Sequence, residues 1–274
     1  MKNRVIYGAL LIVLMACCIF LSPITRVLFF AAGGCLCAWE YSSRMTRTDT
    51  RVSFCVLAFY LALQAVLVLT DAGTAAYCAV FIGSVYLAFL AGILLERVEG
   101  RGALATVAGL AYPCALFGAI MAISVSSIWL ETLAIACLAT WSCDNAAFLG
   151  GRRFGRHKLA ESISPNKTVE GAVIGAAASL ITGVIVYFLG VWCIQLPLVG
   201  GQYTPVPLWL CAVTSVVASS MGQIGDLAES LIKRMIGVKD FSNLIPGHGG
   251  VFDRADSLLF SIPTAYLCLR LAGL

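Results

Sequence analysis

Charged residues are scarce in this chain of 274 residues, of which 12% are Asp, Glu, Lys or Arg and 60% are hydrophobic. Soluble domains typically carry about twice that charged fraction. The composition therefore excludes an ordinary soluble domain and predicts a protein that lives in a lipid bilayer. The net charge of +4 is too small to indicate a class of partner, and no nucleic-acid partner is expected.

Several residue patterns with known chemistry are also missing. The twelve cysteines include no Cys-x-x-Cys pair, and most lie singly in apolar runs, as at Cys55 and Cys114, which argues against a disulfide framework. Only two histidines occur, His157 and His248, and no Ser/His/Asp or Cys/His arrangement is spaced for covalent catalysis. A Walker lysine motif is absent as well.

Long apolar runs are abundant. At about 20 residues per crossing of the hydrocarbon core, they predict an all-α polytopic membrane protein with about nine transmembrane helices. The predicted spans are 5–22, 25–39, 52–70, 74–95, 102–124, 127–143, 169–194, 206–224 and 257–274. The first run is interpreted as a transmembrane helix and not as a cleaved signal, because an Ala-x-Ala cleavage pattern is missing.

The basic residues predict the orientation, because Lys and Arg concentrate in the cytoplasmic loops of membrane proteins. With the N-terminus in the cytoplasm, nine alternating spans place sixteen of the 18 basic residues on the cytoplasmic side. Only Arg26 and Arg270 fall on the other side. We therefore expect a multi-pass protein of the inner, cytoplasmic membrane, with its charged loops facing the cytoplasm.

Charge gathers in two of these loops. Residues 144–168 and 225–256 are expected to form long cytoplasmic loops, separated by a pair of helices. The sequence thus predicts about six N-terminal transmembrane helices in residues 1–143, followed by a catalytic membrane region, 144–274, with both loops and three helices.

Three acids in the later loop suggest a metal site. Asp253 and Asp256 are three residues apart at the start of the last span, so a helix there would place both carboxylates on one face. Asp226, at the end of the eighth span, is a third candidate. Adjacent carboxylates are ionised at low cost only beside a cation, which predicts an oxygen-ligand magnesium site. The alternative is that the acids compensate the helix dipole.

Basic residues accompany these acids. Lys233, Arg234, Lys239 and Arg254 lie in the same loop, and the glycines around His248 allow backbone to approach a ligand closely. The mixture of acids and bases suits a magnesium nucleotide, whose phosphates bridge metal and cations. Alternatively, the basic residues enforce topology, and His248 has only a structural role in its turn.

The earlier loop predicts an anion site. Ser164 and Pro165 are typical of a helix start, with the serine as cap, and Lys167 would then lie in the first turn beside free N–H groups. Asp144 follows the sixth span and is a further metal candidate or an interfacial charge. Glu131 lies inside the sixth span, where function and snorkelling are both open interpretations.

These two segments resemble the phosphatidate cytidylyltransferase, or CDP-diacylglycerol synthase, family. From Ser230 to Asp256 the sequence is similar to the family signature: Ser-x-aliphatic-Lys-Arg, Lys-Asp, then Pro-x-His-Gly-Gly-x-x-Asp-Arg-x-Asp. From Asp144 to Gly171 it resembles a second family block, Gly-Arg-x-Phe-Gly followed by Ile-Ser-Pro-x-Lys-Thr-x-Glu-Gly. Asn145 and Phe148 replace the usual hydroxyl residues, so no hydroxyl role is carried over to them.

The resemblance implies that CTP and phosphatidate react to CDP-diacylglycerol and pyrophosphate, with magnesium required. Two Mg²⁺ ions are expected, while a monovalent cation and a homodimer are left open. The residues assigned to the site fall into three groups: catalytic Asp226, Asp253, Asp256, Lys233 and Arg234; phosphate-binding Ser164, Lys167, Lys239, His248 and Arg254; and metal ligands Asp226, Asp253, Asp256 and Asp144.

Two other functions compete with this prediction. A CTP-dependent polyprenol or lipid-alcohol kinase would use the same kind of magnesium nucleotide site but transfer the γ-phosphoryl group. A transporter or channel would need ionisable residues within several spans, and the predicted spans hold few.

Overall fold

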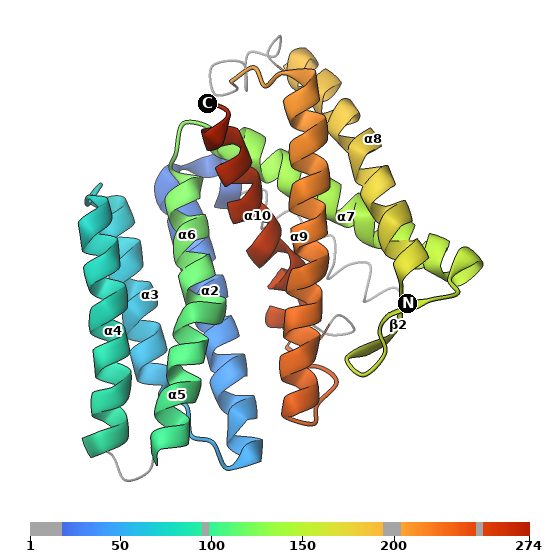
Figure 1. Cartoon of the computed structure of the whole chain (residues 1–274). Coiled ribbons are helices and arrows are strands. Elements are labelled where there is room, and N and C mark those ends of the chain that lie inside the picture. Colours follow the sequence, from blue (N-terminus) through green and yellow to red (C-terminus); the bar gives the residue numbers. More distant parts are fainter. Residues whose placement is uncertain (1–17, 95–98, 194–203, 245–248) are drawn as a thin grey trace. The chain divides into compact units, whose positions relative to one another are not determined.

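The computed structural model describes residues 18–94, 99–193, 204–244 and 249–274. These residues are almost entirely helical, which confirms the predicted helical class (Figure 1). Five helices within the described ranges are long and apolar enough to cross a membrane: Thr74–Leu94, Gly100–Ser124, Trp129–Phe154, Val169–Val191 and Leu208–Met235. The chain is therefore a multi-pass helical membrane protein.

Each of the five helices coincides with a predicted span. The first predicted span, 5–22, lies largely outside the described residues. The predicted spans 25–39, 52–70 and 257–274 correspond to helices that are shorter or more polar than the five, and their crossing of the membrane stays a prediction.

The contacts divide the chain into two compact units, Met1–Val125 with Ile236–Arg254, and Ser126–Met235 with Ala255–Leu274. The predicted boundary at residue 143 separates N-terminal helices from a catalytic region, which is a division by function. The two compact units do not test it, so it stays a prediction.

The first unit is built mainly from helices. They are α2 (Pro23–Met45), α3 (Phe54–Leu69), α4 (Thr74–Leu94), α5 (Glu99–Gly109) and α6 (Ala115–Ser124), with the short elements η1 (Thr46–Thr48) and η2 (Leu110–Cys114). Ser22 caps α2, since its hydroxyl accepts from the Thr25 backbone N–H at 3.1 Å. Pro113 in η2 lacks an N–H donor and interrupts the helix between α5 and α6.

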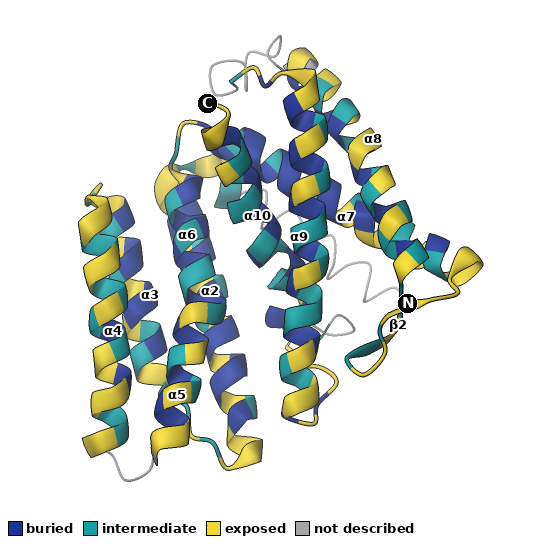
Figure 2. Cartoon of the chain, in the orientation of Figure 1, coloured by how far each residue is buried: buried dark blue, intermediate teal, exposed yellow. Residues whose placement is uncertain are grey.

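Residues 236–244 and 249–254 also pack into this unit. Phe241 and Phe252 are fully buried, with ring centroids 4.6 Å apart, and Tyr112 packs against Phe252 at 5.3 Å. By contrast, few residues of α4 are buried, and its ribbon in Figure 2 is mostly yellow and teal, the colours of exposed and intermediate residues. Most of its exposed side chains, including Ile82 and Ile93, are apolar, which suits contact with lipid.

The second unit contains α7 (Trp129–Phe154), the strands β1 (Lys158–Ala160) and β2 (Ser164–Thr168), α8 (Val169–Cys193), α9 (Leu208–Met235) and α10 (Phe252–Leu271) from Ala255 on. The strands pair antiparallel as a hairpin. Its apolar core includes Ile135 of α7, Val186 of α8, Cys211 of α9 and Leu269 of α10.

Small residues bring the helices of this unit close together. A Cβ atom at Gly175 of α8 would lie 2.8 Å from the Cys143 carbonyl oxygen of α7, and one at Gly183 would lie 2.7 Å from the Cys211 carbonyl oxygen of α9. Close helix contact through glycine is common in membranes, where packing and not water exclusion holds helices together. These contacts hold the helices that carry the candidate site.

Both predicted long loops are shorter than expected. The helix α7 continues through Asp144 to Phe154, and α9 continues through Asp226 to Met235. Hydropathy locates the edge of the hydrocarbon core and not the end of a helix. Polar residues do not stop a helix, so both helices continue beyond the ends of the predicted spans. Asp144, Asp226, Lys233 and Arg234 therefore lie on helices.

Candidate active site

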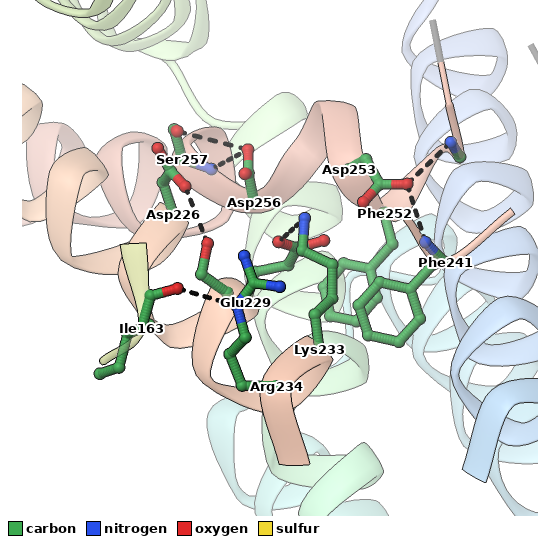
Figure 3. Close-up of polar contacts among 12 residues, drawn as sticks. Ile163, Asp226, Glu229, Lys233, Arg234, Phe241, Phe252, Asp253, Asp256 and Ser257 are labelled. Carbon is green, nitrogen blue, oxygen red and sulfur yellow. Dashed lines mark hydrogen bonds and ion pairs between the residues drawn. The ribbon is translucent and has the colours of Figure 1, made fainter. Parts of the chain in front are cut away.

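Asp226 is half-buried on α9 and is paired with a lysine. The Lys167 ammonium nitrogen lies 2.5 Å from Asp226 Oδ2. On the other side, the Ser230 hydroxyl lies 3.4 Å from Asp226 Oδ1, one turn further along α9 (Figure 3). Because Lys167 belongs to β2, the ion pair joins the hairpin to α9. The structure thus brings together one residue from each of the two predicted motifs.

Asp256 lies on α10 where this helix touches α9. A Cβ atom at Gly225 would lie only 2.5 Å from the Asp256 carbonyl oxygen, so the close approach requires glycine. The Asp256 carboxylate accepts from the Ser257 backbone N–H at 2.6 Å. Burial, followed by the negative charge of Asp226, raises the pKa of Asp256 to about 7, and Asp144 adds a smaller repulsion.

Three carboxylates therefore share one electrostatic environment, from Asp144 of α7, Asp226 of α9 and Asp256 of α10. Their mutual repulsion favours a bound cation, and their oxygens suit Mg²⁺. Within the described residues, no three acidic, histidine or cysteine side chains are placed closely enough to hold a metal ion by themselves. Magnesium usually takes one or two protein carboxylates and completes its shell with water and substrate phosphates, so these donors fit it.

Two cations predicted to be catalytic have partners in the protein. The Lys233 ammonium lies 2.5 Å from the fully buried Glu229 carboxylate, one turn earlier on α9. The Arg234 Nε donates to the Ile163 carbonyl oxygen in the hairpin at 3.0 Å (Figure 3). Arg234 therefore holds the hairpin against α9, as does Lys167.

The predicted helix start at Ser164 and Pro165 is wrong. Both residues lie in β2, where Ser164 pairs with Ala160, and α8 begins at Val169. Thr168 acts as the cap, because its hydroxyl accepts from the Gly171 backbone N–H at 3.2 Å. Lys167 is thus placed by the hairpin and not by a helix turn.

Glu170 fixes the open end of the hairpin, opposite its turn. Its carboxylate accepts from the backbone N–H groups of Arg156 at 3.0 Å and His157 at 3.2 Å, and it lies 2.5 Å from the His157 ring nitrogen. The contact closes the chain between α7 and α8 into a compact basic turn. Glu170 was part of the family-like block but had no expected role.

Asp253 lies in the other compact unit and is nearly buried, with 8% of its surface exposed. Its Oδ2 accepts from the backbone N–H groups of Gly250 at 2.9 Å and Phe241 at 3.0 Å (Figure 3). Asp253 therefore orders the turn before α10. A metal role for Asp253 stays a prediction, although the helix places it three residues before Asp256, as expected.

The remaining predicted residues are placed as follows. Lys239 is exposed in the segment after α9, and Arg254 is exposed in the first turn of α10. His248 lies outside the described residues. Glu131 does not snorkel, because it is fully buried and accepts a hydrogen bond from the Thr204 backbone N–H.

Glu40 is a residue near the motif that sequence reasoning missed. It is 1% exposed on α2, and its carboxylate accepts from the Ser242 hydroxyl and from the backbone N–H groups of Val251 at 3.0 Å and Phe252 at 2.8 Å. The available signal was an acid at the end of an apolar run, immediately after the predicted span 25–39.

Comparisons with known proteins identify the family of the chain. The sequence profile of the cytidylyltransferase family matches residues 2–272. A phosphatidate cytidylyltransferase of Staphylococcus saprophyticus is 40% identical over 140 residues, which are 51% of this chain and 49% of the relative. One of Bacillus subtilis is 40% identical over 136 residues, 50% of this chain and 46% of the relative.

A third relative is matched over a longer stretch. The phosphatidate cytidylyltransferase of Brucella suis is 36% identical over 200 residues, which are 64% of this chain and 68% of that protein. The chain spans about half the length of the first two relatives.

Proposed function

Because the chain belongs to the cytidylyltransferase family, we propose that it is a phosphatidate cytidylyltransferase. CTP and phosphatidate would be its substrates, and CDP-diacylglycerol and pyrophosphate its products. The names of the relatives support the lipid substrate. The observation that carries the proposal is the carboxylate group of Asp144, Asp226 and Asp256 with the Lys167 ammonium beside it.

The reaction joins two polyanions. A phosphate oxygen of phosphatidate forms a bond to the α-phosphorus of CTP, and the bond from that phosphorus to the bridging oxygen of the β-phosphate breaks in line. The attacking oxygen is already anionic, so no general base is needed. Catalysis therefore depends on neutralising charge and aligning the two substrates.

The chain's own residues suit this task. Asp226 and Asp256, with Asp144 beside them, would hold magnesium, and Asp253 is a further candidate on the same face of α10. A bound Mg²⁺ would neutralise phosphate charge and polarise the α-phosphorus. Lys167 would turn from Asp226 to a substrate phosphate when metal binds, because the carboxylate then has another cation. Arg254 and Lys239, both exposed, are the remaining phosphate candidates, and Ser164 lies three residues before Lys167 in the same strand.

The proposed placement in the membrane follows from the charge pattern. Nine spans with a cytoplasmic N-terminus in the inner membrane would put the hairpin, the end of α9 and the start of α10 on the cytoplasmic side. Soluble CTP and the phosphatidate headgroup would meet there. The proposal does not depend on a homodimer or on a monovalent cation, and both are compatible with it.

The test is a labelling assay on the purified full chain with phosphatidate and Mg²⁺. CTP labelled at the α-phosphate should transfer its label into lipid, and CTP labelled at the γ-phosphate should release it as pyrophosphate. A chelator should stop the reaction, and added Mg²⁺ should restore it; dCTP and ATP serve as comparators. Label from the γ-phosphate in lipid would instead show a kinase, and movement of solute across liposomes without transfer would show a transporter.

A further inference from the structure

Glu40 occupies an unusual position for a carboxylate. It lies on the membrane helix α2, is 1% exposed, and accepts three hydrogen bonds from residues about 200 positions later in the chain. Two of its donors are the N–H groups of Phe252, the first residue of α10, and of Val251 immediately before it. Burial of a carboxylate is costly unless such partners are present, so this contact has a specific role in the fold.

The two carboxylates Glu40 and Asp253 enclose one glycine. A Cβ atom at Gly250 would lie 2.7 Å from Glu40 Oε1 and 2.9 Å from Asp253 Oδ2. Gly249 has a φ of 84°, in the left-handed region that favours glycine. The adjacent glycines of the motif are thus explained by a turn that folds tightly against the protein's own carboxylates, whereas the sequence suggested close approach to a ligand.

Helix α2 holds this segment at a second point. Arg44, one turn after Glu40, donates from Nε to the Phe241 carbonyl oxygen, and the Phe241 backbone N–H donates to Asp253. Glu40 also accepts from the hydroxyl of Ser242, the next residue. Residues 241–242 and 251–252 are therefore held against one face of α2 by a buried acid and a base four residues apart.

We propose that Glu40 is a positioning residue for the reaction: it fixes the turn that begins α10 and thereby aligns Asp253, the metal candidate in the first turn of that helix. This inference rests on the proposed function, since it assigns Glu40 a task in that chemistry. Glu40 does not touch the substrate. It acts through the backbone N–H groups of Val251 and Phe252.

Glu40→Gln is the sharpest variant, because it keeps the size of the side chain. Glutamine has one accepting oxygen where glutamate has two, so it cannot accept from all three donors in the same way. Its NH₂ group would face at least one of the three donors and could not accept from it. We expect kcat to fall by about tenfold or more, with a smaller change in the KM for CTP. Ser42→Ala is the matched control: Ser42 is buried on α2, and among the residues that the structure describes its hydroxyl bonds only to the Trp39 carbonyl oxygen of its own helix, at 3.1 Å. Its kcat should stay within about twofold of the parent chain.

Hydrogen exchange separates positioning from general stability. In Glu40→Gln, the amides of Val251 and Phe252 should exchange faster while those of α3 and α6 keep their rates. Unchanged kcat, unchanged exchange at the two amides, or faster exchange throughout residues 23–125 with a lower melting temperature would each overturn the proposal. Ser242→Ala removes one donor and should show the same local effect more weakly, which keeps the test decisive if Glu40→Gln does not fold.

The same measurements separate this inference from the proposed function. If the unmodified chain transfers no label from CTP to lipid, the proposed function fails. The exchange rates at Val251 and Phe252 then still decide whether Glu40 holds the turn. If the unmodified chain is active and Glu40→Gln is equally active, only the role of Glu40 is wrong.

Discussion

At the scale of single residues, Asp253 has two possible tasks that one pair of variants can separate. Its Oδ2 accepts from two backbone N–H groups, those of Gly250 and Phe241. Asparagine can keep both hydrogen bonds with its carbonyl oxygen while removing the charge, whereas alanine loses the bonds as well. If Asp253 binds metal, Asp253→Asn should lose about 100-fold or more in kcat with an unchanged melting temperature, because a neutral amide is a far weaker ligand for magnesium.

The contrast with Asp253→Ala completes this prediction. Loss of two buried hydrogen bonds should lower the melting temperature of the alanine variant, whichever task Asp253 has. An active Asp253→Asn together with an inactive Asp253→Ala would show that Asp253 only orders the turn. Label transfer and thermal unfolding in detergent, measured on the same preparations, decide between the two.

Residue spacing in the sequence revealed some of these contacts and concealed others. The pattern pointed to Asp226, Asp256 and Lys167, and the structure places Lys167 2.5 Å from Asp226. Lys233 was predicted to be catalytic, and its ion pair with Glu229, four residues earlier on the same helix, is a contact that spacing alone could have predicted. Glu40 was missed because its partners are about 200 residues away, and no local pattern encodes a contact at that separation.

At the scale of secondary structure, hydropathy found the long helices but not their ends. It located α8 to within a residue, because both of its ends coincide with changes in polarity. It ended α7 and α9 about ten residues early, where the chain becomes polar without changing direction. Hydropathy did not predict the hairpin, because its strands have only three and five residues. The hairpin is held instead by polar contacts of Lys167, Arg234 and Glu170, which hydropathy does not register.

The contact between α9 and α10 is the element that places Asp226 relative to Asp256, and two glycines on α9 test it. A Cβ atom at Gly225 would lie 2.5 Å from the Asp256 carbonyl oxygen, while one at Gly222 would lie 3.2 Å from a Thr140 methyl group and 3.3 Å from the Ser257 carbonyl oxygen. Gly225→Ala should therefore push the helices apart and lower kcat by about tenfold or more, because a small misplacement of catalytic groups is costly.

Gly222→Ala is the matched comparison, one turn away on the same helix. The added methyl group would lie close to its neighbours but not overlap them, and a small shift can relieve the contact. The activity of Gly222→Ala should therefore stay within a few-fold of the parent chain. Label transfer measured for both variants at equal amounts of folded protein gives the result. Equal activities would show that the spacing of α9 and α10 at Gly225 is not what aligns the two carboxylates.

At the scale of the whole molecule, the residues of one continuous motif are divided between the two compact units. The family-like segment from residue 230 to 256 begins on α9, in the second unit, contributes residues 236–254 to the first, and returns to the second with Ala255. Sequence reasoning assigned this segment to one loop of one region. The family profile, which matches residues 2–272, covers both units.

The orientation of the chain in the membrane is the remaining prediction at this scale, and α3 offers the most demanding place to test it. This helix has 16 residues, so it is about 24 Å long, shorter than the roughly 30 Å hydrocarbon core. Thr48 and Asp71 are exposed beyond its two ends. With a cytoplasmic N-terminus and nine spans, Thr48 faces the cytoplasm and Asp71 the outside.

Cysteines at these two positions, in an active version of the chain with its native cysteines replaced, should react differently with a membrane-impermeant maleimide. Asp71→Cys should be labelled in intact cells, and Thr48→Cys only after the cells are permeabilised. The reverse pattern would invert the orientation and move the carboxylates away from cytosolic CTP. Labelling of both in intact cells would mean that α3 does not cross the membrane, and every later span would then need a new assignment.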